Sequence, residues 1–470
     1  MSTDRRVDVA IIGAGTSGLN AMAQARRAGK SFVLINGGHL GTTCARVGCM
    51  PSKAFIQVAE DFHRREVFDR HGIVGEESLN FSMVDALDHV RDMRDIFVDR
   101  VMGSSTDDLA DELIDGYAHF LEPTVLEVNE TRVIAGSVVI ATGSRPIVPT
   151  EWEEKFCDHI LTTDDIFEQE TLPESIAVIG LGVIGLELGQ SLSRFGLKVT
   201  GIDQVNTIAR LSDPVVASAA TEILGKEFPL VLGQPAAVKK EGGRLRVTAG
   251  DTSIVVEKIL ASMGRVPNLE SLKLGDIGVE LDAKGMPRFD PRTMQIEGFP
   301  IFLAGDISGE RPILHEAGDE GKIAGYNASH DSILAFRRKT PLSITFSDPN
   351  IVQTGMEWSE LAERDDVAVG EMRMGPVGRA LIMAKNKGVI RVYAEKHGGR
   401  LLGASLIAPK GENLGHLLAW SIQQRQTVFD LLRMPFYHPV IEEALQAALY
   451  NLAGNVEGPQ TSPIRELELA

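Results

Sequence analysis

The chain has 470 residues, of which 43% are hydrophobic and 24% charged, so we expect several globular domains rather than one hydrophobic core. With 65 acidic against 47 basic residues the formal charge is -18, which disfavours binding to nucleic acid or anionic lipid in the absence of a basic patch. No apolar run approaches the roughly 20 residues that span a bilayer, and the start of the chain is polar. We therefore expect a soluble, cytoplasmic protein that binds neither nucleic acid nor membranes.

Two segments repeat one glycine pattern. Residues 8–20 read DVAIIGAGTSGLN and residues 175–187 read SIAVIGLGVIGLE, each an apolar run followed by G-x-G-x-x-G and a helical pattern. In such a unit the first glycine permits a tight turn, the second lets a pyrophosphate approach the backbone, and the third lets the helix pack on the strand. One copy alone would be a weak signal, but two copies in this context predict two dinucleotide sites. The glycines are Gly13, Gly15 and Gly18 in the first copy and Gly180, Gly182 and Gly185 in the second.

The residue that binds a ribose ends the second strand of each unit, about 20 residues after the glycines. Asp203 stands 23 residues after Gly180, and Asn36 stands 23 residues after Gly13. A carboxylate accepts hydrogen bonds from both ribose hydroxyls and repels a 2′-phosphate, so Asp203 favours NAD over NADP. Asn36 binds a ribose without charge and therefore predicts weaker anchoring of the first dinucleotide.

The remaining patterns predict the domain organisation. Apolar runs end in glycine at 138–143 (VVIATG) and near 301–306 (IFLAGD), as buried strands do where ligands bind in open α/β sheets. From about Pro341 the pattern changes to alternating strands, with a helix after Glu412. We expect an α/β protein with two Rossmann-like dinucleotide-binding domains and a C-terminal α+β domain. The expected segments are 1–150 and 269–338 for the two parts of the first dinucleotide domain, 151–268 for the second, 339–453 for the C-terminal domain, and 454–470 for a loose tail.

Residues 41–53, GTTCARVGCMPSK, hold two of the three cysteines. We expect Cys44 and Cys49 to begin a helix about one turn apart, close enough for a disulfide if that turn is distorted. A helix N-terminus also lowers a thiol pKa, as a nucleophilic thiol requires. A structural zinc ion would need two more Cys or His ligands at matching spacing, and none is paired nearby, so no metal is expected. We therefore favour redox chemistry at this pair, and interpret the isolated Cys157 as a structural thiol.

Several motifs together resemble the class I pyridine nucleotide-disulfide oxidoreductases, the flavin disulfide reductases that include dihydrolipoamide dehydrogenase, glutathione reductase and mercuric reductase. The resemblance covers nearly the full chain. It implies FAD in the first site, NAD in the second, and a homodimer formed through the C-terminal domain. The motifs are C-x-x-x-x-C-x-P-S-K from Cys44, A-T-G at 141–143, G-R-V-P-N at 264–268, G-D at 305–306, and His438-Pro439 with Glu443.

The resemblance also implies roles for single residues. Cys49 is expected nearer the flavin, as the charge-transfer thiolate, and Cys44 is expected to meet the substrate. Lys53 is expected near flavin N5, paired with Glu187, and Asp306 is expected to bind the ribitol. The other residues expected to contact a cofactor are Thr43, Ala118, Thr142, Gly143, Val183, Ile184, Gly264, Arg265 and Leu314.

His438 is the expected general base, although eleven histidines are present and a His-Pro pair alone would not distinguish one. Glu443 lies on a helix that Pro439 can begin, where it could accept the imidazole proton, fix the tautomer and raise the basicity. In the resembling enzymes this histidine reaches the flavin site of the partner subunit. The resemblance therefore implies a homodimer whose active sites are shared between subunits.

Lipoamide is the leading substrate. P-S-K after Cys49 and G-x-G-x-I-G-x-E-L at 180–188 are similar to dihydrolipoamide dehydrogenase or mercuric reductase, and the C-terminal vicinal cysteines of mercuric reductases are missing. A lipoyl domain of a 2-oxoacid dehydrogenase complex would then be a partner. Three departures leave another small disulfide open: Thr42 where the family usually has Gly, Arg46 where it has Asn, and Val440-Ile441-Glu442 where dihydrolipoamide dehydrogenases have Thr-Leu-Ser.

Two other classes of function remain as alternatives. A soluble transhydrogenase or diaphorase would pass hydride between nicotinamides or to quinones, and a non-enzymatic flavoprotein would serve as a redox sensor or scaffold. Cys44, Cys49 and His438 argue against the first, because its chemistry needs neither a disulfide nor a base. A disulfide reductase would gain two thiols per subunit with NADH, and neither alternative would.

Overall fold

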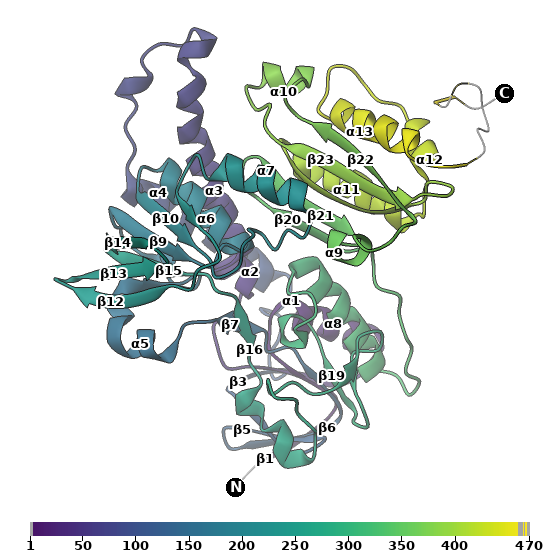
Figure 1. The fold of residues 1–470 in the computed structure, drawn as a ribbon. Helices are drawn as coiled ribbons and strands as arrows, with labels where there is room; N and C mark the ends of the chain where they lie inside the picture. Colours follow the sequence, from purple (N-terminus) through teal and green to yellow (C-terminus); the bar gives the residue numbers. More distant parts are fainter. Residues whose placement is uncertain (1–2, 459–463, 465, 468–470) are drawn as a thin grey trace.

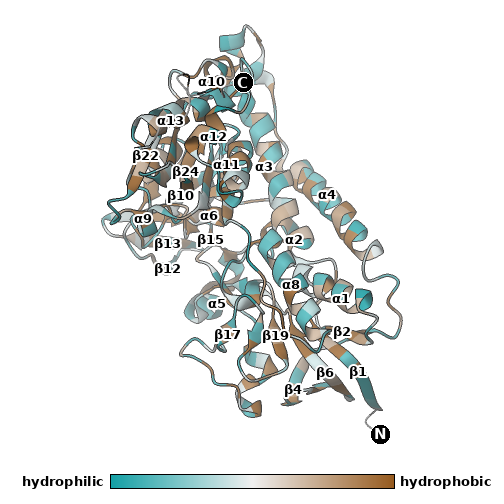
Figure 2. Cartoon of the chain, turned by 90° about the vertical axis from the view of Figure 1, so that its right-hand side faces the viewer, coloured by the Kyte–Doolittle hydropathy of each residue, from teal (hydrophilic) through white to brown (hydrophobic). Residues whose placement is uncertain are grey.

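The structure is a computed structural model that describes residues 3–458, 464, 466 and 467 (Figure 1). Three main sheets and their helices form a lower part, a left part and an upper right part of the view, and α2 (Thr43–Arg46) lies where the three parts meet. Hydrophobic residues dominate the central parts of the sheets, while helices such as α3 (Cys49–His63) carry both hydrophilic and hydrophobic residues (Figure 2). The predicted α/β fold with two Rossmann-like sheets and a C-terminal α+β part is confirmed.

The first sheet is built around β1 (Thr3–Ile12), which pairs in parallel with β2 (Phe32–Asn36) and β6 (Thr131–Ile140). The buried, mostly β-branched side chains of β1 and β2 explain why these segments form central strands. Helices α1 (Thr16–Arg27) and α8 (Leu314–Ala328) pack on this sheet and on each other. The other strands are β3 (Leu113–Asp115), β4 (Ala118–Glu122), β5 (Val125–Val128), β17 (Phe289–Asp290), β18 (Gln295–Ile296) and β19 (Ile301–Leu303).

The second sheet repeats the same unit. β9 (Ser175–Ile179) is buried throughout and leads into α6 (Val183–Arg194), while β10 (Lys198–Ile202) lies parallel beside β9. A loop then leads to α7 (Pro214–Leu224). The remaining parallel strands are β8 (Ile160–Leu161), β11 (Leu230–Val231) and β15 (Lys258–Ala261), and an antiparallel sheet adds β12 (Ala237–Glu241), β13 (Arg244–Ala249) and β14 (Thr252–Val256). Strands β7 (Ser144–Pro146) and β16 (Arg265–Pro267) pair where the chain passes between the two sheets.

The third sheet is antiparallel, in the order β20-β21-β24-β23-β22. Its core is formed by the fully buried strand β24 with helices α11 and α13 packed on the sheet. The strands are β20 (Leu342–Thr345), β21 (Asn350–Gly355), β22 (Val367–Arg373), β23 (Val389–Glu395) and β24 (Leu401–Ala408), and the helices are α9 (Trp358–Leu361), α10 (Gly378–Ile382), α11 (Gly411–Gln423), α12 (Val428–Leu432) and α13 (Glu442–Gly454).

A pair of long helices, α3 and α4 (Met83–Gly103), packs together and projects at the upper left of Figure 1. The first turn of α3 carries the second cysteine, and α3 also packs against α6 of the second sheet. Phe55 of α3 is fully buried and contacts the ring of Phe195, at the end of α6, edge to face with centroids 4.8 Å apart. The cysteine segment is therefore packed against the second dinucleotide-binding sheet through α6.

The expectation that residues 454–470 form a loose tail is wrong for residues 454–458. Glu457 N donates to Lys396 O and Gly398 N donates to Glu457 O, at 2.7 and 2.9 Å, so residues 455–458 continue against the third sheet. Further on, Glu466 hydrogen-bonds the hydroxyl of Tyr450 on α13. Residues 459–463, 465 and 468–470 lie outside the described part of the chain.

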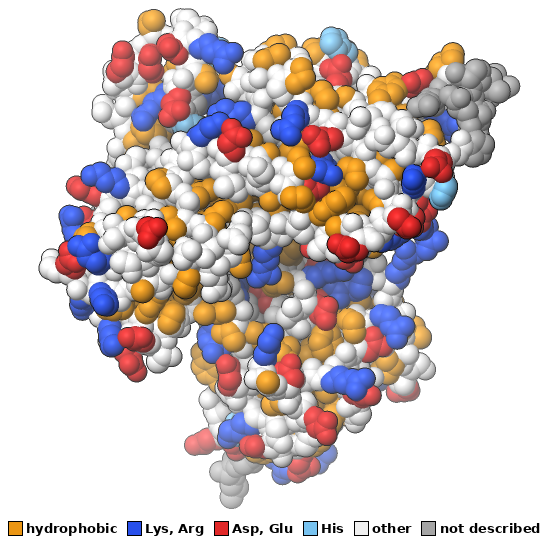
Figure 3. Space-filling view, viewed as in Figure 1, with side chains coloured by type: hydrophobic (Ala, Val, Ile, Leu, Met, Phe, Trp, Pro, Cys, Tyr) orange, Lys and Arg blue, Asp and Glu red, His pale blue; other side chains and the backbone are white. Residues whose placement is uncertain are grey.

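Charge is unevenly distributed over the surface in spite of the net value of -18. In the space-filling view, Lys and Arg side chains gather in the hollow between the lower part and the rest of the molecule (Figure 3). Elsewhere on this face basic and acidic side chains are interspersed. The one part of this face where basic side chains concentrate is therefore the junction of the domains.

Candidate active site

The two glycine loops have matching geometry. Gly13 and Gly180 take positive φ values of 107° and 97°, which an L side chain rarely adopts. The third glycines pack against the first ones, because a Cβ at Gly18 would lie 1.9 Å from Gly13 O, and a Cβ at Gly185 would lie 1.9 Å from Gly180 O. Each loop therefore needs glycine at these positions to fold.

The middle glycines face open space. Apart from its chain neighbours, a Cβ at Gly182 would meet no described heavy atom within 4 Å, and one at Gly15 would meet only Ala141 O, at 4.0 Å. Helices α1 and α6 begin directly after these glycines, with Val183 and Ile184 in the first turn of α6. Open space at the N-terminus of a helix is what a pyrophosphate requires. The residues of both loops therefore fit a dinucleotide.

The ribose positions are also equivalent in the two units. Asn36 ends β2, and its Oδ1 accepts a hydrogen bond from Ala14 N at 3.1 Å. Asp203 follows β10, and its Oδ2 accepts one from Leu181 N at 2.6 Å. The two side chains differ in their second contact, because Asn36 Nδ2 donates to Gly38 O at 2.5 Å while Asp203 Oδ1 accepts from Val205 N at 3.1 Å. Each side chain is thus held beside its glycine loop.

A polar cluster lies where β6 and β19 end. Ser144 Oγ donates to Asp306 Oδ2 at 2.8 Å and accepts from Arg265 Nε at 2.8 Å. Thr142 Oγ1 donates to Asn268 O at 2.8 Å, and Gly143 has a φ of 65°. The structure therefore brings together the predicted residues Thr142, Gly143, Asp306, Gly264 and Arg265. Sequence reasoning missed Ser144, although it directly follows the A-T-G motif.

Two further predicted FAD contacts differ in exposure. Ala118 begins β4 and is buried, two residues after Gly116, whose N–H donates to Asn36 O. Leu314 begins α8 and is 44% exposed, so its side chain is accessible to a ligand.

The cysteines do not share one helix, which corrects the sequence-based expectation. Cys44 lies in the short helix α2 and Cys49 begins α3, because Gly48 takes φ -113° and ψ -115° and interrupts the helix between them. Both are thiols here, Cys44 half-buried and Cys49 exposed. The hydrogen bond that Cys44 donates, assisted by the positive charge of Lys53, lowers the pKa of Cys49 to about 7. The same hydrogen bond, with burial, raises the pKa of Cys44.

One turn after Cys49, Lys53 connects the thiol pair to the second dinucleotide unit. Lys53 Nζ donates to Glu187 Oε2 at 2.7 Å, and Glu187, on α6, is 3% exposed. Glu187 Oε1 accepts from Phe346 N at 2.8 Å, and Lys53 Nζ lies 4.7 Å from the centroid of the Phe346 ring. The carboxylate is therefore fixed on both oxygens. Sequence reasoning missed Phe346, which the third sheet's first strand brings to this point.

His438 and Glu443 form the second catalytic candidate. His438 Nδ1 and Glu443 Oε1 are 2.8 Å apart, and Glu443 Oε2 accepts from Val440 N at 3.1 Å. The hydrogen bond with His438 lowers the pKa of Glu443. Helix α13 begins at Glu442 rather than at Pro439, so the expected helix start is wrong, although Glu443 still lies in the first turn.

His438 is open to contact from outside the chain. Its side chain is 80% exposed, and α13 lies apart from α2 in both Figure 1 and Figure 2. Glu443, in the first turn of α13, can accept a hydrogen bond from Nδ1–H of His438. Nε2 is then the imidazole nitrogen that can take a proton.

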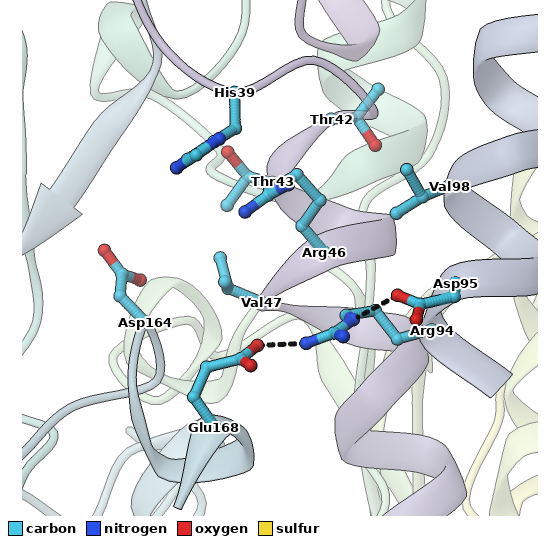
Figure 4. A pocket seen from close by; sticks show the side chains of 10 residues that line it. All are labelled: His39, Thr42, Thr43, Arg46, Val47, Arg94, Asp95, Val98, Asp164 and Glu168. Carbon is cyan, nitrogen blue, oxygen red and sulfur yellow. Dashed lines mark hydrogen bonds and ion pairs between the residues drawn. The ribbon is translucent and has the colours of Figure 1, made fainter. Parts of the chain in front are cut away.

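A pocket of about 660 Å³ lies along α2, the short helix that holds Cys44, although neither cysteine lines it (Figure 4). Two of the three departures from the family pattern, Thr42 and Arg46, line it, together with the predicted contact Thr43. Thr42 has a φ of 67°, where glycine is favoured, and its hydroxyl accepts from Ala45 N at 3.3 Å. The other lining residues are His39, Val47, Arg94, Asp95, Val98, Asp164 and Glu168.

Other sites are not evident in the described residues. No group of three or more His, Cys, Asp or Glu side chains among them is placed to hold a metal ion. Every helix of the described chain is too short or too polar to cross a bilayer. Cys157 is exposed at the start of a short 3-10 helix, with its sulfur 3.7 Å from Asp158 Oδ1.

Two dinucleotide loops connected through α3 and α6 to a close pair of thiols define an oxidoreductase of the flavin and nicotinamide dithiol class. Residues 7–321 match the sequence pattern of the pyridine nucleotide-disulphide oxidoreductases, and residues 342–449 match the dimerisation domain of these enzymes. The chain belongs to the pyridine nucleotide-disulphide oxidoreductase family. It is a flavoprotein disulfide oxidoreductase with FAD and NAD as cofactors, as the motifs predicted, and the dimerisation domain supports a homodimer.

Similar proteins agree with this family. The chain is 30% identical over 460 residues to a dihydrolipoyl dehydrogenase of Thermus scotoductus, covering 94% of this chain and 96% of that protein. It is 28% identical over 461 residues to one of Geobacillus stearothermophilus, covering 93% and 94%. Among solved structures, LpdA of Mycobacterium tuberculosis has a TM-score of 0.83 at 21% identity, covering 95% of this chain and 99% of that one. The flavoprotein disulfide reductase RclA of Escherichia coli has 0.82 at 20% identity, covering 96% and 100%.

Proposed function

We propose that the protein is a dihydrolipoamide dehydrogenase that oxidises dihydrolipoamide with NAD through FAD and the Cys44–Cys49 pair. One observation carries most of this proposal: the helix that begins at Cys49 also carries Lys53, whose partner Glu187 lies on the helix of the second glycine loop. The dithiol and the proposed NAD site are therefore connected through one ion pair, whose carboxylate is buried.

The chain's own residues are proposed to perform the thiol exchange. One substrate sulfur attacks Cys44, the Cys44–Cys49 bond breaks, and Cys49 leaves as a thiolate. The second substrate sulfur, deprotonated by Nε2 of His438 of the partner subunit, attacks the first, which forms the oxidised substrate and releases Cys44. Glu443 holds Nδ1 of that histidine, so that Nε2 is the basic nitrogen. When bound, FAD takes the two electrons of the reduced pair and passes them to NAD.

The low pKa of Cys49 supports its part in this exchange. A thiol whose pKa is about 7 leaves readily as the thiolate at neutral pH, whereas the raised pKa of Cys44 favours its protonated form once the exchange has released it. Cys49 is therefore the proposed partner of the flavin, and Cys44 the proposed partner of the substrate.

A substrate panel tests the proposed reaction. NAD reduction by dihydrolipoamide is measured beside NADH oxidation by lipoamide, glutathione disulfide, coenzyme A disulfide and mercuric ion. Lipoamide and dihydrolipoamide are expected to be the fastest pair. If another disulfide reacts faster, that disulfide is the substrate in place of lipoamide. Arg46, two residues after Cys44 and on the wall of the pocket, is then a candidate for the residue that changes the substrate preference.

The proposal includes a partner and a location. A lipoyl domain of a 2-oxoacid dehydrogenase complex would present the dithiol, and the cytoplasm would be the site of the reaction. Copurification of the protein with a lipoylated protein from its own cells tests the proposed partner. The Cys44→Ser variant, which cannot oxidise the dithiol, is used beside the wild type.

Asp203 predicts a preference for NAD of at least about tenfold over NADP, which corresponds to about 1.4 kcal/mol. Its two oxygens are held by Leu181 N and Val205 N, which keeps the carboxylate beside the glycine loop, and its charge would repel a 2′-phosphate. Asp203→Ala should raise the Michaelis constant for NAD and reduce the preference for NAD over NADP. Asp203→Asn is the matched variant, because it keeps an acceptor oxygen and removes the charge. Equal catalytic efficiency with the two nucleotides in the wild type would contradict this prediction.

Asn36 predicts that FAD is held less tightly than a carboxylate would hold it, because hydrogen bonds to a charged group are roughly twice as strong as neutral ones. Asn36→Glu should therefore lose FAD more slowly during dialysis against a chaotropic salt. Asn36→Asp should lose it faster, since an oxygen would replace Nδ2 at 2.5 Å from Gly38 O. Equal rates of flavin loss in the wild type and both variants would show that residue 36 is not limiting.

A further inference from the structure

The loop of residues 203–213 lies between the second glycine loop and the third sheet. On one side, two hydrogen bonds join it to Leu181, which lies between the first two glycines of the glycine loop. Leu181 N donates to Asp203 Oδ2 at 2.6 Å, and Ala209 N donates to Leu181 O at 2.9 Å. A shift of this loop would therefore shift both the ribose-binding carboxylate and the pyrophosphate site.

The other side of the same loop is held by the C-terminal domain. Gln353 Nε2 of β21 donates to Ala209 O at 3.5 Å, and Ser359 N of α9 donates to Ser212 Oγ at 3.2 Å. At the end of the loop, the hydroxyl of Tyr393 on β23 donates to Asp213 Oδ2 at 2.6 Å. Figure 1 shows α7, which follows the loop, between the second sheet and the strands of the third.

Asp213 has more partners than any other residue of this loop named above. It is completely buried, and its Oδ1 caps α7 by accepting from Val215 N at 2.9 Å and Val216 N at 3.1 Å. Its Oδ2 also lies 3.1 Å from Arg391 Nε, in an ion pair that crosses between the domains. A buried carboxylate without its partners is costly, so this cluster holds α7 against β23 in one position.

The loop needs this external support. Ala209 and Arg210 have φ values of 51° and 54°, and two successive non-glycine residues in the left-handed region cost free energy. Such a conformation persists only when surrounding contacts fix it. Ala209 is one of the residues that the C-terminal domain contacts directly, through Gln353.

We propose that the C-terminal domain sets the affinity for NAD, by holding the 203–213 loop through Tyr393, Gln353 and the backbone of Ser359. This inference rests on the proposed assignment of the second glycine loop to NAD. Tyr393 and Asp213 are then positioning residues, which act on the nucleotide through Asp203 and Leu181. The domain that forms the dimer also prepares the NAD site of its own subunit.

Calorimetric titration of NAD into the oxidised holoenzyme tests this proposal. Tyr393→Phe removes the hydroxyl and keeps the ring, and Gln353→Ala is a milder variant that removes a contact at the loop's surface. Each should raise the Kd for NAD by about threefold to tenfold, the usual size of coupling through such a network. The Michaelis constant for the dithiol and the FAD content should stay within twofold of the wild type. The matched control is Tyr450→Phe, which loses a hydrogen bond to Glu466 in the same domain but does not touch the loop.

The outcomes separate positioning from general stability. An unchanged Kd in both variants would overturn the proposal, even if Tyr393→Phe lowers Tm, and so would an equal rise in Tyr450→Phe. A wild-type holoenzyme that does not bind NAD would instead refute the assignment of the second glycine loop, on which the inference depends. A rise in the Kd for NAD that is confined to Tyr393→Phe and Gln353→Ala, with the Michaelis constant for the dithiol unchanged, supports the proposal that these residues position the loop.

Discussion

Cys49→Ser should abolish both dithiol turnover and the long-wavelength absorption that a thiolate beside the flavin gives, whereas Cys44→Ser should abolish turnover alone. The reason is the asymmetry of the pair, in which Cys49 has a pKa lowered to about 7 and Cys44 has a raised one. The absorption of each variant holoenzyme, with its flavin oxidised and at a pH above 7, is the measurement. The long-wavelength band in Cys49→Ser instead of Cys44→Ser would reverse the proposed roles.

The substitution at residue 44 also tests the cause of the low pKa. A serine at 44 keeps a hydroxyl that can donate to Cys49, while Cys44→Ala keeps no donor. The thiolate of Cys49 forms as the pH rises through its pKa, so alkylation of Cys49 by iodoacetamide should be half-maximal near pH 7 in Cys44→Ser and at a higher pH in Cys44→Ala.

The matched control is Cys157→Ser, which removes the exposed third cysteine and should leave this midpoint unchanged while simplifying the alkylation assay. Equal midpoints in Cys44→Ser and Cys44→Ala would show that the hydrogen bond is not what lowers the pKa. The coulombic effect of Lys53 would then be the main cause, and Lys53→Met would shift the midpoint instead.

The dinucleotide units could be predicted from the sequence because their geometry is local. A strand, a tight turn and a helix fix the distance to the next strand, so the equal spacing from Gly13 to Asn36 and from Gly180 to Asp203 predicted two side chains that the structure places equivalently. The glycines carry a steric requirement that no other residue meets, as the close approach of Gly18 to Gly13 O shows. Such patterns remain readable in a single sequence.

Features that depend on one residue's backbone conformation or on a distant contact could not be predicted in this way. The helix break between Cys44 and Cys49 depends on the backbone of Gly48, and glycine there is equally compatible with a continuous distorted turn. The start of α13 at Glu442 depends on the non-helical backbone at Val440, whose N–H is taken by Glu443. The contacts of Tyr393 with the nucleotide-binding half join residues 180 positions apart, and no local pattern marks them.

The Lys53–Glu187 pair shows how the two kinds of information combine. The family resemblance implied the pair, but the backbone N–H of Phe346 that fixes the second oxygen of Glu187 comes from the third sheet. A buried carboxylate needs all its partners, so the C-terminal domain is part of the structure that holds the dithiol near the NAD loop. The second and third sheets therefore meet at one carboxylate, where α3 joins them, as well as at the 203–213 loop.

Removing the proposed base should be nearly as damaging as removing a cysteine. His438→Gln is expected to lower turnover by on the order of 100-fold to 10,000-fold, the usual contribution of general base catalysis, because the substrate dithiol can no longer be deprotonated as it attacks. Glu443→Gln should cost less, since the imidazole remains and only its orientation and basicity change. Steady-state turnover of dihydrolipoamide with NAD is the measurement, and FAD content and Tm serve as controls for folding. An equal loss in the two variants would show that Glu443 does more than orient the ring.

The family resemblance predicts that His438 serves the thiol pair of the other subunit, and the exposure of its side chain is compatible with that role. Inactive Cys44→Ser protein mixed with inactive His438→Gln protein, under conditions that exchange subunits, should regain activity. Each mixed dimer would then have one intact site, formed by Cys44 of one chain and His438 of the other, and one site defective in both residues. Counting independent sites in a symmetric dimer predicts about half the wild-type activity per mixed dimer. If mass spectrometry shows that mixed dimers have formed and activity does not return, each subunit must build its own site, and the dimer must have another role.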